Sequence, residues 1–244
     1  MSDSAQTPHA DEVEREAADE RPDEPDDESH VEPIETGADA VVSALKNAGV
    51  DHLFGVQGGA IMPVYDALYS ESDMTHVTMA HEQGAVHAAD AYGIVTGDPG
   101  VCMATSGPGA TNLVTGIADA SMDSDPLIAL TGQVPTDLVG NDAFQETDTI
   151  GVTQPITKYN RFATSPDEVG DDVSTAFALA DEGRQGPTLV DLPKDVTQPE
   201  TDVEPGKPET PDTYNPPEKA DAEAVSEAAD VISDAEKPII LAGG

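Results

Sequence analysis

The carboxylate with the clearest chemical potential in this sequence is Glu82. It belongs to the segment His81-Glu82-Gln83-Gly84, which directly follows a short apolar run at residues 75–80 and is surrounded by Ala and Gly. A carboxyl group in such a setting can hold a proton or exchange it with a ligand. A glutamate at the start of a helix is also favoured by the helix dipole alone, so this motif by itself is compatible with a purely structural role.

A glycine-rich loop provides a second candidate. Residues 106–112 read Ser-Gly-Pro-Gly-Ala-Thr-Asn and follow the apolar run 100–105. The loop lacks the Lys-Ser/Thr ending of a P-loop, and Asn112 stands where a dinucleotide-binding loop needs glycine. Ala104 replaces the glycine that a hydrolase nucleophile elbow needs before Ser106. The remaining interpretation is a backbone that lets a flat ligand approach closely, with Asn112 as its polar anchor.

Three weaker signals complete the set. The turn Gln57-Gly58-Gly59-Ala60 follows residues 50–56, and on its own it indicates only a tight strand-to-helix connection. The long segment 133–149 places Phe144 beside Gln145, and loops of this length are often functional. Lys194 is one of five bases between residues 37 and 197, and a surface countercharge would explain it equally well.

Metal chemistry finds little support in the residue pattern. A zinc-protease motif would need a second His at position 85, which is Ala. His87 lies six residues beyond His81, so a helix turns the two side chains apart, and we interpret His87 as a satisfied helix residue. The single Cys102 has apolar neighbours, which predicts a buried, inert thiol and excludes an intramolecular disulfide. We therefore expect no metal ligand in this chain.

Short apolar runs alternate with helical stretches, and these elements must position the candidates. Continuous apolar runs separated by about a helix length indicate a parallel sheet that is covered on both faces. The predicted fold is therefore α/β, a doubly wound parallel sheet whose ligand lies beyond the carboxyl ends of the strands. The predicted strands are residues 50–56, 75–80, 100–105, 126–131, 161–164 and 188–192, and the predicted helices are 63–70, 83–96, 110–122 and 166–182.

The chain divides into four predicted regions. Residues 1–35 are acidic and too poor in apolar residues to bury a core, so we expect a disordered leader. Residues 36–197 form the α/β domain, which opens with a helix that Thr36 and Asp39 cap and Gly49 ends. Residues 198–219 contain six Pro and form a linker. Residues 220–244 begin a second, truncated α/β domain, with a helix at 220–235 and a buried strand at 238–242.

The charge balance restricts the partners. The chain has 49 Asp and Glu against 10 Lys and Arg, a formal net charge of −39. Binding to nucleic acid or to an anionic membrane needs clustered bases, so neither partner is expected. The acidic excess continues through residues 37–197, which is typical of proteins from salty environments. No apolar run approaches a membrane span and the N-terminus is unlike a secretory signal, so we expect a cytoplasmic protein.

Six short motifs occur in an order that resembles one enzyme family. They are Gly-Gly-Ala at 58–60, His-Glu-Gln-Gly-Ala at 81–85, Ala-Thr-Ser-Gly-Pro-Gly-Ala-Thr-Asn-Leu at 104–113, Thr-Gly-Gln-Val-Pro at 131–135, Asp-Ala-Phe-Gln-Glu at 142–146 and Asp-Leu-Pro-Lys-Asp-Val at 191–196. Together they resemble the N-terminal portion of the acetolactate (acetohydroxyacid) synthase large, catalytic subunit, a thiamine diphosphate-dependent enzyme. The segment 131–146 distinguishes this synthase from thiamine diphosphate enzymes at large.

The resemblance implies a pyrimidine-binding domain for thiamine diphosphate, followed by the start of a central domain. It implies a transferase that condenses two 2-keto acids, pyruvate with pyruvate or 2-oxobutanoate, with loss of carbon dioxide in branched-chain amino acid biosynthesis. Mg²⁺ would have its ligands outside this chain, and FAD would bind mainly through the central domain. The active site would form between subunits of a homodimer or a higher homo-oligomer, with a possible regulatory small subunit.

Site residues follow from the resemblance position by position. Glu82 matches the carboxyl that hydrogen-bonds the aminopyrimidine ring of the cofactor. Other positions that match the cofactor side are Gln57, Gly58, Thr105, Pro108 and Asn112. Positions that match the substrate approach are Gly59, Ala60, Phe144, Gln145 and Lys194. Gln57, Ala80 and Thr136-Asp137 depart from residues common in the family, which affects the outer channel and the flavin edge.

Two other functions remain compatible with the sequence. One is a thiamine diphosphate-dependent decarboxylase or carboligase that acts on a different 2-keto acid. The other is a non-catalytic, free-standing pyrimidine domain that binds a partner subunit. The sequence contains no Gly-Asp-Gly segment with a downstream Asn for diphosphate and magnesium, so the isolated chain is expected to be inactive.

Overall fold

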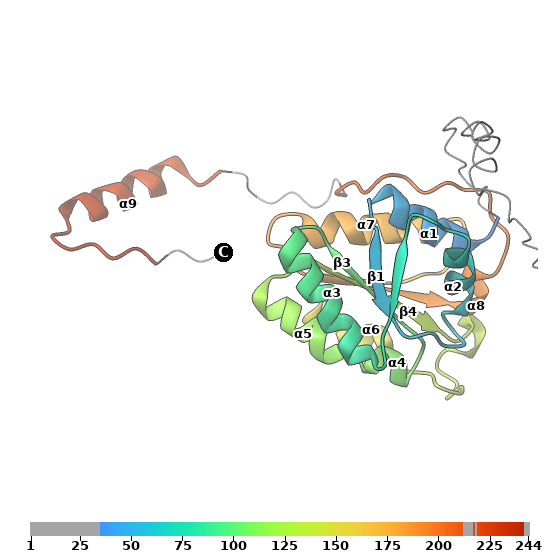
Figure 1. The fold of residues 1–244 in the computed structure, drawn as a ribbon. Coiled ribbons are helices and arrows are strands. Elements are labelled where there is room, and N and C mark those ends of the chain that lie inside the picture. The colour runs from blue at the N-terminus through green and yellow to red at the C-terminus, as the bar shows by residue number, and fades with distance from the viewer. Residues whose placement is uncertain (1–34, 212–216, 218, 242–244) are drawn as a thin grey trace, which may run out of the picture. The chain divides into compact units, whose positions relative to one another are not determined.

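A six-stranded parallel sheet forms the centre of the folded region (Figure 1). The computed structural model describes residues 35–211, 217 and 219–241, so the predicted leader lies outside the described residues except for Glu35. The strand order is β2-β1-β3-β4-β6-β5, and every neighbouring pair is parallel. The strands are β1 (His52–Gly55), β2 (Thr75–Thr78), β3 (Gly100–Ala104), β4 (Leu127–Gln133), β5 (Tyr159–Phe162) and β6 (Pro187–Pro193).

Helices and short 3-10 turns precede, connect and follow the strands. Those before β4 are α1 (Gly37–Asn47), α2 (Met62–Tyr69), α3 (Glu82–Thr96), α4 (Pro108–Thr111) and α5 (Val114–Asp123). Those after β4 are η1 (Thr136–Leu138), α6 (Thr149–Thr153), η2 (Gln154–Ile156), α7 (Val169–Asp181), α8 (Lys194–Thr197) and α9 (Ala222–Asp234). The predicted doubly wound α/β fold is confirmed, and each predicted strand from residue 50 to 192 overlaps an observed one.

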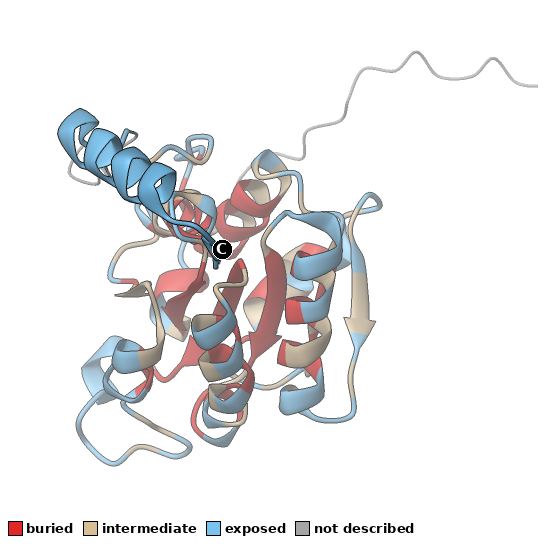
Figure 2. Cartoon of the chain, turned by 90° about the vertical axis from the view of Figure 1, so that its left-hand side faces the viewer, coloured by how far each residue is buried: buried red, intermediate tan, exposed pale blue. Residues whose placement is uncertain are grey.

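Two hydrophobic clusters cover the two faces of the sheet. Figure 2 shows that the buried residues gather around the sheet at the centre of the domain. One core packs α1, α2 and α7 against Val101 and Met103 of β3. The other packs α3 and α5 against Cys102 and Ala104 of the same strand. Alternate residues of one fully buried strand therefore serve opposite faces, which explains why β3 is apolar throughout. Cys102 is buried and free, as predicted.

The chain reverses direction across the sheet at β1 and β3. From β1 it passes to β2 on one side, and from β2 it crosses back to β3 on the other side of β1. The carboxyl ends of β1 and β3 thus flank a topological switch point, where ligands bind in open α/β sheets. The segments that follow these two strands are residues 57–61, which contain the predicted Gly58-Gly59 turn, and residues 105–107, which begin the predicted glycine-rich motif; residues 108–111 of that motif form helix α4.

Local signals fix the helix ends. The predicted capping box is present: Thr36 Oγ1 accepts from Asp39 N at 3.3 Å, and Asp39 Oδ2 accepts from Thr36 N at 2.9 Å. Gly97 ends α3 in the left-handed region, with φ of +83°. The prediction of one continuous helix over 110–122 is wrong, because the segment forms two helices, α4 and α5. They are separated at Leu113, whose N–H donates to Ala110 O, three residues back, in a 3-10-type turn.

The proline-rich segment after residue 198 contains no helix or strand up to residue 211, in line with its composition. Much of it nevertheless contacts the domain through hydrogen bonds. Thr201 Oγ1 donates to Asp167 at 2.7 Å, and Ser174 Oγ donates to Gly206 O at 2.8 Å. Residues 199–206 thus run along the domain surface, and whether this region links two domains stays a prediction.

The C-terminal helix forms as predicted, since α9 overlaps the expected helix at 220–235. The predicted strand at 238–242 is wrong for its described part, because residues 238–241 carry no strand. Ile239 and Leu241 are 94% and 97% exposed, and no described strand pairs with them. A lone segment has no partner for its backbone N–H and C=O groups, so apolar sequence alone does not make it a strand. No helix among the described residues is long and apolar enough to cross a membrane.

Candidate cofactor site

Two loops meet at the switch point through Thr105. Its Oγ1 accepts a hydrogen bond from Ala60 N at 3.2 Å, which joins the end of β3 to the turn after β1. Gly58 lies so close that an added Cβ would stand 2.4 Å from Thr105 Cβ. A larger residue at position 58 would therefore separate the loops, and the predicted cofactor positions Gly58 and Thr105 depend on each other.

Glu82 lies beside this junction as the first residue of α3. Glu82 is only half-buried in this chain, although Ala and Gly are its neighbours in the sequence. Asn112 Nδ2 donates to Glu82 Oε2 at 2.9 Å. No other hydrogen bond to the Glu82 carboxyl occurs among the described residues, so Oε1 is available to a ligand. The preceding His81 caps the helix by accepting from Gln83 N at 3.1 Å.

The glycine-rich loop is shaped by two close approaches. A Cβ on Gly109 would lie 2.8 Å from Thr105 Cγ2 and 3.6 Å from Glu82 Oε1, so glycine keeps the space beside this oxygen open. Gly107 has φ of +56°, and a Cβ there would lie 2.4 Å from the carbonyl oxygen of Gln145. Pro108 begins α4, and its carbonyl accepts from Asn112 N at 3.1 Å, which fixes the backbone that carries the Asn112 amide.

The loop between β4 and α6 closes onto Gly107 through its backbone. The backbone of Gln145 also lies in the left-handed region, with φ of +56°. This conformation is strained for a residue other than glycine, so the surrounding contacts must maintain it. The Glu146 carboxylate accepts from Gly140 N and from Ala143 N, the latter at 2.8 Å, and these hydrogen bonds lower the pKa of Glu146. Phe144 is 85% exposed. The loop therefore presents Phe144 outward, next to the segment that contacts the glycine-rich loop.

A buried polar network holds the base of this loop. Asp191 on β6 is 1% exposed and accepts from Thr131 Oγ1 at 2.6 Å and from Gln133 Nε2 at 2.9 Å. Gln133 Nε2 also donates to Thr147 O at 3.0 Å, and its Oε1 accepts from Val134 N at 2.9 Å. Burial raises the pKa of Asp191 to about 7, against the hydrogen bonds from Thr131 and Gln133. Gln133 thus ties the two ends of the loop together, and the Asp191 carboxyl holds the Gln133 amide in place.

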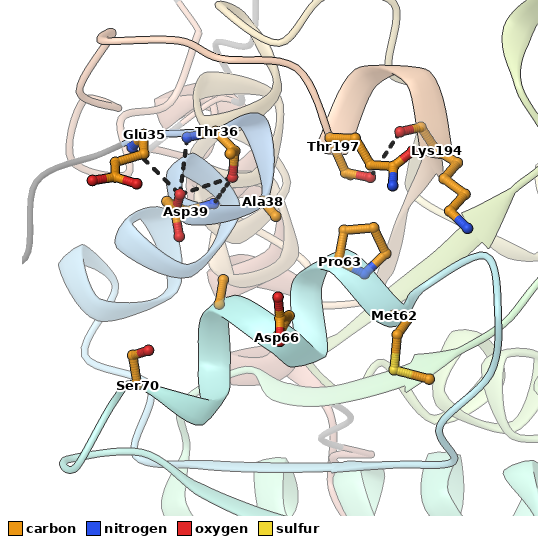
Figure 3. A pocket seen from close by; sticks show the side chains of 12 residues that line it. Glu35, Thr36, Ala38, Asp39, Met62, Pro63, Asp66, Ser70, Lys194 and Thr197 are labelled. Carbon is orange, nitrogen blue, oxygen red and sulfur yellow. Dashed lines mark hydrogen bonds between the residues drawn. The ribbon is translucent and has the colours of Figure 1, made fainter.

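Two predicted site residues make contacts with residues other than Glu82 and Asn112. Gln57 Nε2 donates to Thr78 Oγ1 at 3.1 Å, on the β2 side of the turn. Lys194 begins α8 and lines a pocket of about 550 Å³ together with Met62 and Pro63 of α2 (Figure 3). None of the other predicted site residues lines that pocket. Gly59 faces open space, since a Cβ there would meet nothing within 4 Å.

Sequence reasoning gave no role to four residues that build the site: Thr131, Gln133, Glu146 and Asp191. A signal for three of them was present, because Thr131, Gln133 and Asp191 interrupt strands whose other residues are almost all apolar. A polar side chain within a fully buried strand requires a hydrogen-bond partner. The pairing of β4 with β6, which sets Thr131 opposite Asp191, supplies it.

Comparison with known proteins agrees with this geometry. Residues 35–152 match the family described as "Thiamine pyrophosphate enzyme, N-terminal TPP binding domain". The chain is 51% identical over 212 residues to the probable acetolactate synthase large subunit of Methanocaldococcus jannaschii, covering 85% of this chain and 36% of that protein. It is 51% identical over 210 residues to the acetolactate synthase large subunit of Corynebacterium glutamicum, covering 86% and 33%.

A third relative is the acetolactate synthase large subunit of Parasynechococcus marenigrum, 49% identical over 214 residues, covering 86% of this chain and 35% of that protein. The chain therefore spans about a third of the length of the relatives it matches. The parallel α/β sheet, the polar pair at its switch point and these similarities agree with one another. The chain carries the N-terminal domain of the thiamine pyrophosphate enzyme family, in a sequence that corresponds to an N-terminal portion of acetolactate synthase large subunits.

Proposed function

We propose that this chain is the pyrimidine-binding portion of an acetolactate synthase catalytic subunit. The complete protein would condense two 2-keto acids, pyruvate with pyruvate or with 2-oxobutanoate, and release carbon dioxide. The observation that carries the proposal is the contact between Asn112 and Glu82 at the switch point. About 50% identity to acetolactate synthase large subunits over most of the chain supports the same function.

The residues present fit the aminopyrimidine ring of thiamine diphosphate. A flat ring needs close access to backbone, and Gly109 leaves space beside Glu82 Oε1 that a Cβ would reduce. The turn at Gly58 and the loop at Thr105 and Pro108 would line the ring, and Gln57 would border it from the β2 side. When bound, thiamine diphosphate supplies the carbon nucleophile and the electron sink that decarboxylation of a 2-keto acid requires.

Glu82 would hold a proton at Oε1, opposite a ring nitrogen of the cofactor. The Asn112 amide engages Oε2, so the carboxyl group cannot rotate freely and Oε1 stays directed away from Asn112. A fixed carboxyl that gives and takes one proton is the requirement for general acid-base catalysis. Asn112 is then a positioning residue, which acts through Glu82.

The substrate side is assigned to Gly59, Ala60, Phe144, Gln145 and Lys194. The open space at Gly59 and the exposed ring of Phe144 suit a surface that a second subunit completes. We infer a homodimer or higher homo-oligomer, a possible regulatory small subunit, and a cytoplasmic location. Mg²⁺ and FAD would be held by parts of the complete protein outside these 244 residues.

The test uses a protein that includes the remaining two thirds found in the relatives. Glu82→Gln is expected to keep the fold and to lower kcat about 100-fold or more, because an amide cannot exchange the proton. Glu223→Gln is the matched control, since Glu223 also lies in the first turn of a helix. Acetolactate formation from pyruvate alone identifies the reaction, whereas another product would indicate a different thiamine diphosphate-dependent enzyme. Parent-like acetolactate synthesis by Glu82→Gln would refute the assignment.

The 244-residue chain alone is expected to show no carboligation and little affinity for thiamine diphosphate. Residues 37–197 hold 23 acids and five bases, so this region repels a diphosphate unless cations compensate. Calorimetric titration of the cofactor with Mg²⁺ measures this directly. Tight, Mg²⁺-dependent binding would reveal a diphosphate site within the chain and would contradict the division of roles proposed here.

A further inference from the structure

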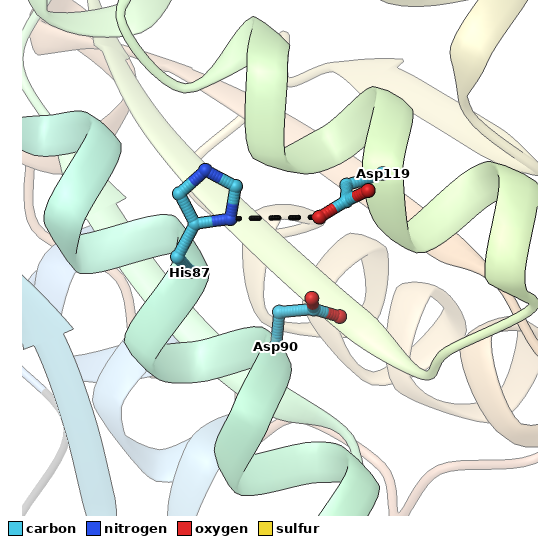
Figure 4. Close-up of side chains that lie close together, drawn as sticks. All are labelled: His87, Asp90 and Asp119. Carbon is cyan, nitrogen blue, oxygen red and sulfur yellow. Dashed lines mark ion pairs between the residues drawn. The ribbon is translucent and has the colours of Figure 1, made fainter.

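Three side chains between α3 and α5 converge to form a cluster that the proposed function does not use. They are His87 and Asp90 of α3 and Asp119 of α5 (Figure 4). One ligating atom from each lies within 4.8 Å of the others, and His87 Nδ1 stands 3.7 Å from Asp119 Oδ2. Asp90 lies eight residues after Glu82 on the same helix, about 12 Å along its axis, so the cluster is separate from the cofactor site.

The decisive observation concerns Asp90. This carboxyl is 7% exposed, and its Oδ1 has no hydrogen-bond partner among the described residues. A buried charged oxygen without a partner carries a large desolvation cost, so native proteins pair such groups with a donor or a cation. Figure 4 shows the Asp90 side chain directed into the space between α3 and α5, where His87 and Asp119 also point.

The surroundings increase the need for positive charge. Asp119, Asp123 and Asp125 lie near enough to Asp90 to disfavour its negative charge, whereas His87 favours it. The carboxyl of Asp125, two residues after the end of α5, is in hydrogen-bonding contact with the Asp90 carboxyl. Arg184 donates to Ser124 Oγ at 2.8 Å, between Asp123 and Asp125, but among the described residues no ion pair joins a Lys or Arg to these carboxylates. Four carboxyl groups therefore share one imidazole.

We propose that His87, Asp90 and Asp119 bind one first-row divalent transition cation, with Zn²⁺ and Mn²⁺ as the fitting ions. One imidazole nitrogen with two carboxylates suits these metals, whereas Ca²⁺ and Mg²⁺ prefer oxygen ligands only. Metal-ligand bonds near 2.0–2.2 Å require ligand atoms roughly 3.5 Å apart, so the three atoms must move together by about 1 Å. His87 and Asp119 have room for this, with side chains 40% and 58% exposed.

Such an ion would link α3 to α5. These helices pack closely, because a Cβ on Gly116 of α5 would lie 2.4 Å from Val86 Cγ1 of α3. The ion would neutralise the unpaired Asp90 oxygen and replace repulsion between the two helices by shared coordination. Binding should therefore raise the melting temperature of the chain, since a ligand that binds only the folded state stabilises it.

The test must separate a built site from the acidic surface, because 49 acids bind divalent cations weakly everywhere. We would titrate ZnCl₂ into the 244-residue chain by calorimetry in 0.5 M KCl, which screens diffuse attraction. MnCl₂ binding would be followed by electron paramagnetic resonance. His87→Ala, Asp90→Asn and Asp119→Asn each remove one ligand. The control Asp98→Asn removes an exposed charge that follows α3 but lies outside the cluster.

One saturable equivalent is expected, with an affinity at least tenfold lower in each ligand variant and unchanged in Asp98→Asn. Zn²⁺ should raise the melting temperature of the parent and of Asp98→Asn, but not of His87→Ala. His87→Gln provides a second variant if His87→Ala fails to fold, and circular dichroism checks each protein. The proposal is overturned by unsaturable uptake equal in all variants, or by one equivalent that survives loss of His87 and Asp119.

Discussion

Replacing Asp191 by Asn should change how the stability of this domain depends on pH. Asp191 is 1% exposed, and burial raises its pKa to about 7 from an ordinary value of 3.8. In the unfolded chain the carboxyl ionises near pH 3.8, whereas in the folded chain it keeps its proton until about pH 7. The folded state therefore loses stability as the pH rises between these two values, because the carboxyl has released its proton in the unfolded state but still holds it in the folded state.

The magnitude follows from the two pKa values. Each pH unit between them costs the folded state about 1.4 kcal/mol, so the total loss is about 4 kcal/mol. Between pH 5 and pH 8 the expected loss is about 3 kcal/mol, and it levels off above pH 7. Asp191→Asn does not titrate and should lack this component entirely.

The variant also carries a cost that is independent of pH. Thr131 Oγ1 and Gln133 Nε2 both donate to the Asp191 carboxyl, and Asn offers one acceptor oxygen in place of two. The new amide nitrogen would face the Gln133 amide nitrogen, and Gln133 Oε1 is already engaged by Val134 N. One unsatisfied buried donor costs about 1–3 kcal/mol. The variant should thus be the less stable protein at pH 5 and should recover relative to the parent by pH 8.

Urea unfolding at several pH values between 5 and 8, at constant KCl, measures the free energies of unfolding. The difference between parent and variant isolates residue 191, because the titration of every other group largely cancels. Asp66→Asn is the control, since Asp66 is exposed on α2 and its curve should run parallel to that of the parent. Parallel curves for the parent and Asp191→Asn would show that Asp191 has no raised pKa and would refute the reasoning.

Two further predictions concern the glycine-rich loop and the charge balance. Gly107→Ala should lower the free energy of unfolding, measured by urea denaturation, by about 2 kcal/mol or more, because position 107 has a positive φ and a Cβ there would lie 2.4 Å from Gln145 O. Gly97 also has a positive φ, but a Cβ there would meet nothing within 4 Å. Gly97→Ala should therefore lower the free energy of unfolding by a smaller amount. An equal loss in both would contradict the predicted contact. The thermal midpoint of the chain should rise from dilute to molar KCl, whose Debye length of about 3 Å screens neighbouring carboxylates, and a flat midpoint would contradict the inference of a salt-adapted protein.

Local sequence patterns were sufficient to predict most helices and strands of this domain. Buried parallel strands are short apolar runs, and residues 100–105 and 188–192 show this directly and correspond to β3 and β6. The start of α1 was equally visible, because the capping box of Thr36 and Asp39 joins residues only three positions apart. Such features depend on neighbours within a few residues, so they predicted the doubly wound fold and pointed to Glu82 and Asn112, whereas Gly58 became a candidate only through the family resemblance.

Contacts between distant segments were decided only by the tertiary structure. Asn112 reaches Glu82 across 30 residues, and the chain breaks the predicted helix over 110–122 next to this contact. The pairing of β4 with β6 likewise brings Asp191 to Thr131, 60 residues away in the sequence. The sequence pattern paired His87 with no residue of another element, yet α5 brings Asp119 Oδ2 to 3.7 Å from His87 Nδ1. The periodicity of apolar residues indicates which face of a helix or strand is buried. It does not indicate which residues of two different elements will lie close together. Polar groups on separate elements therefore find their partners only when the sheet and its helices pack.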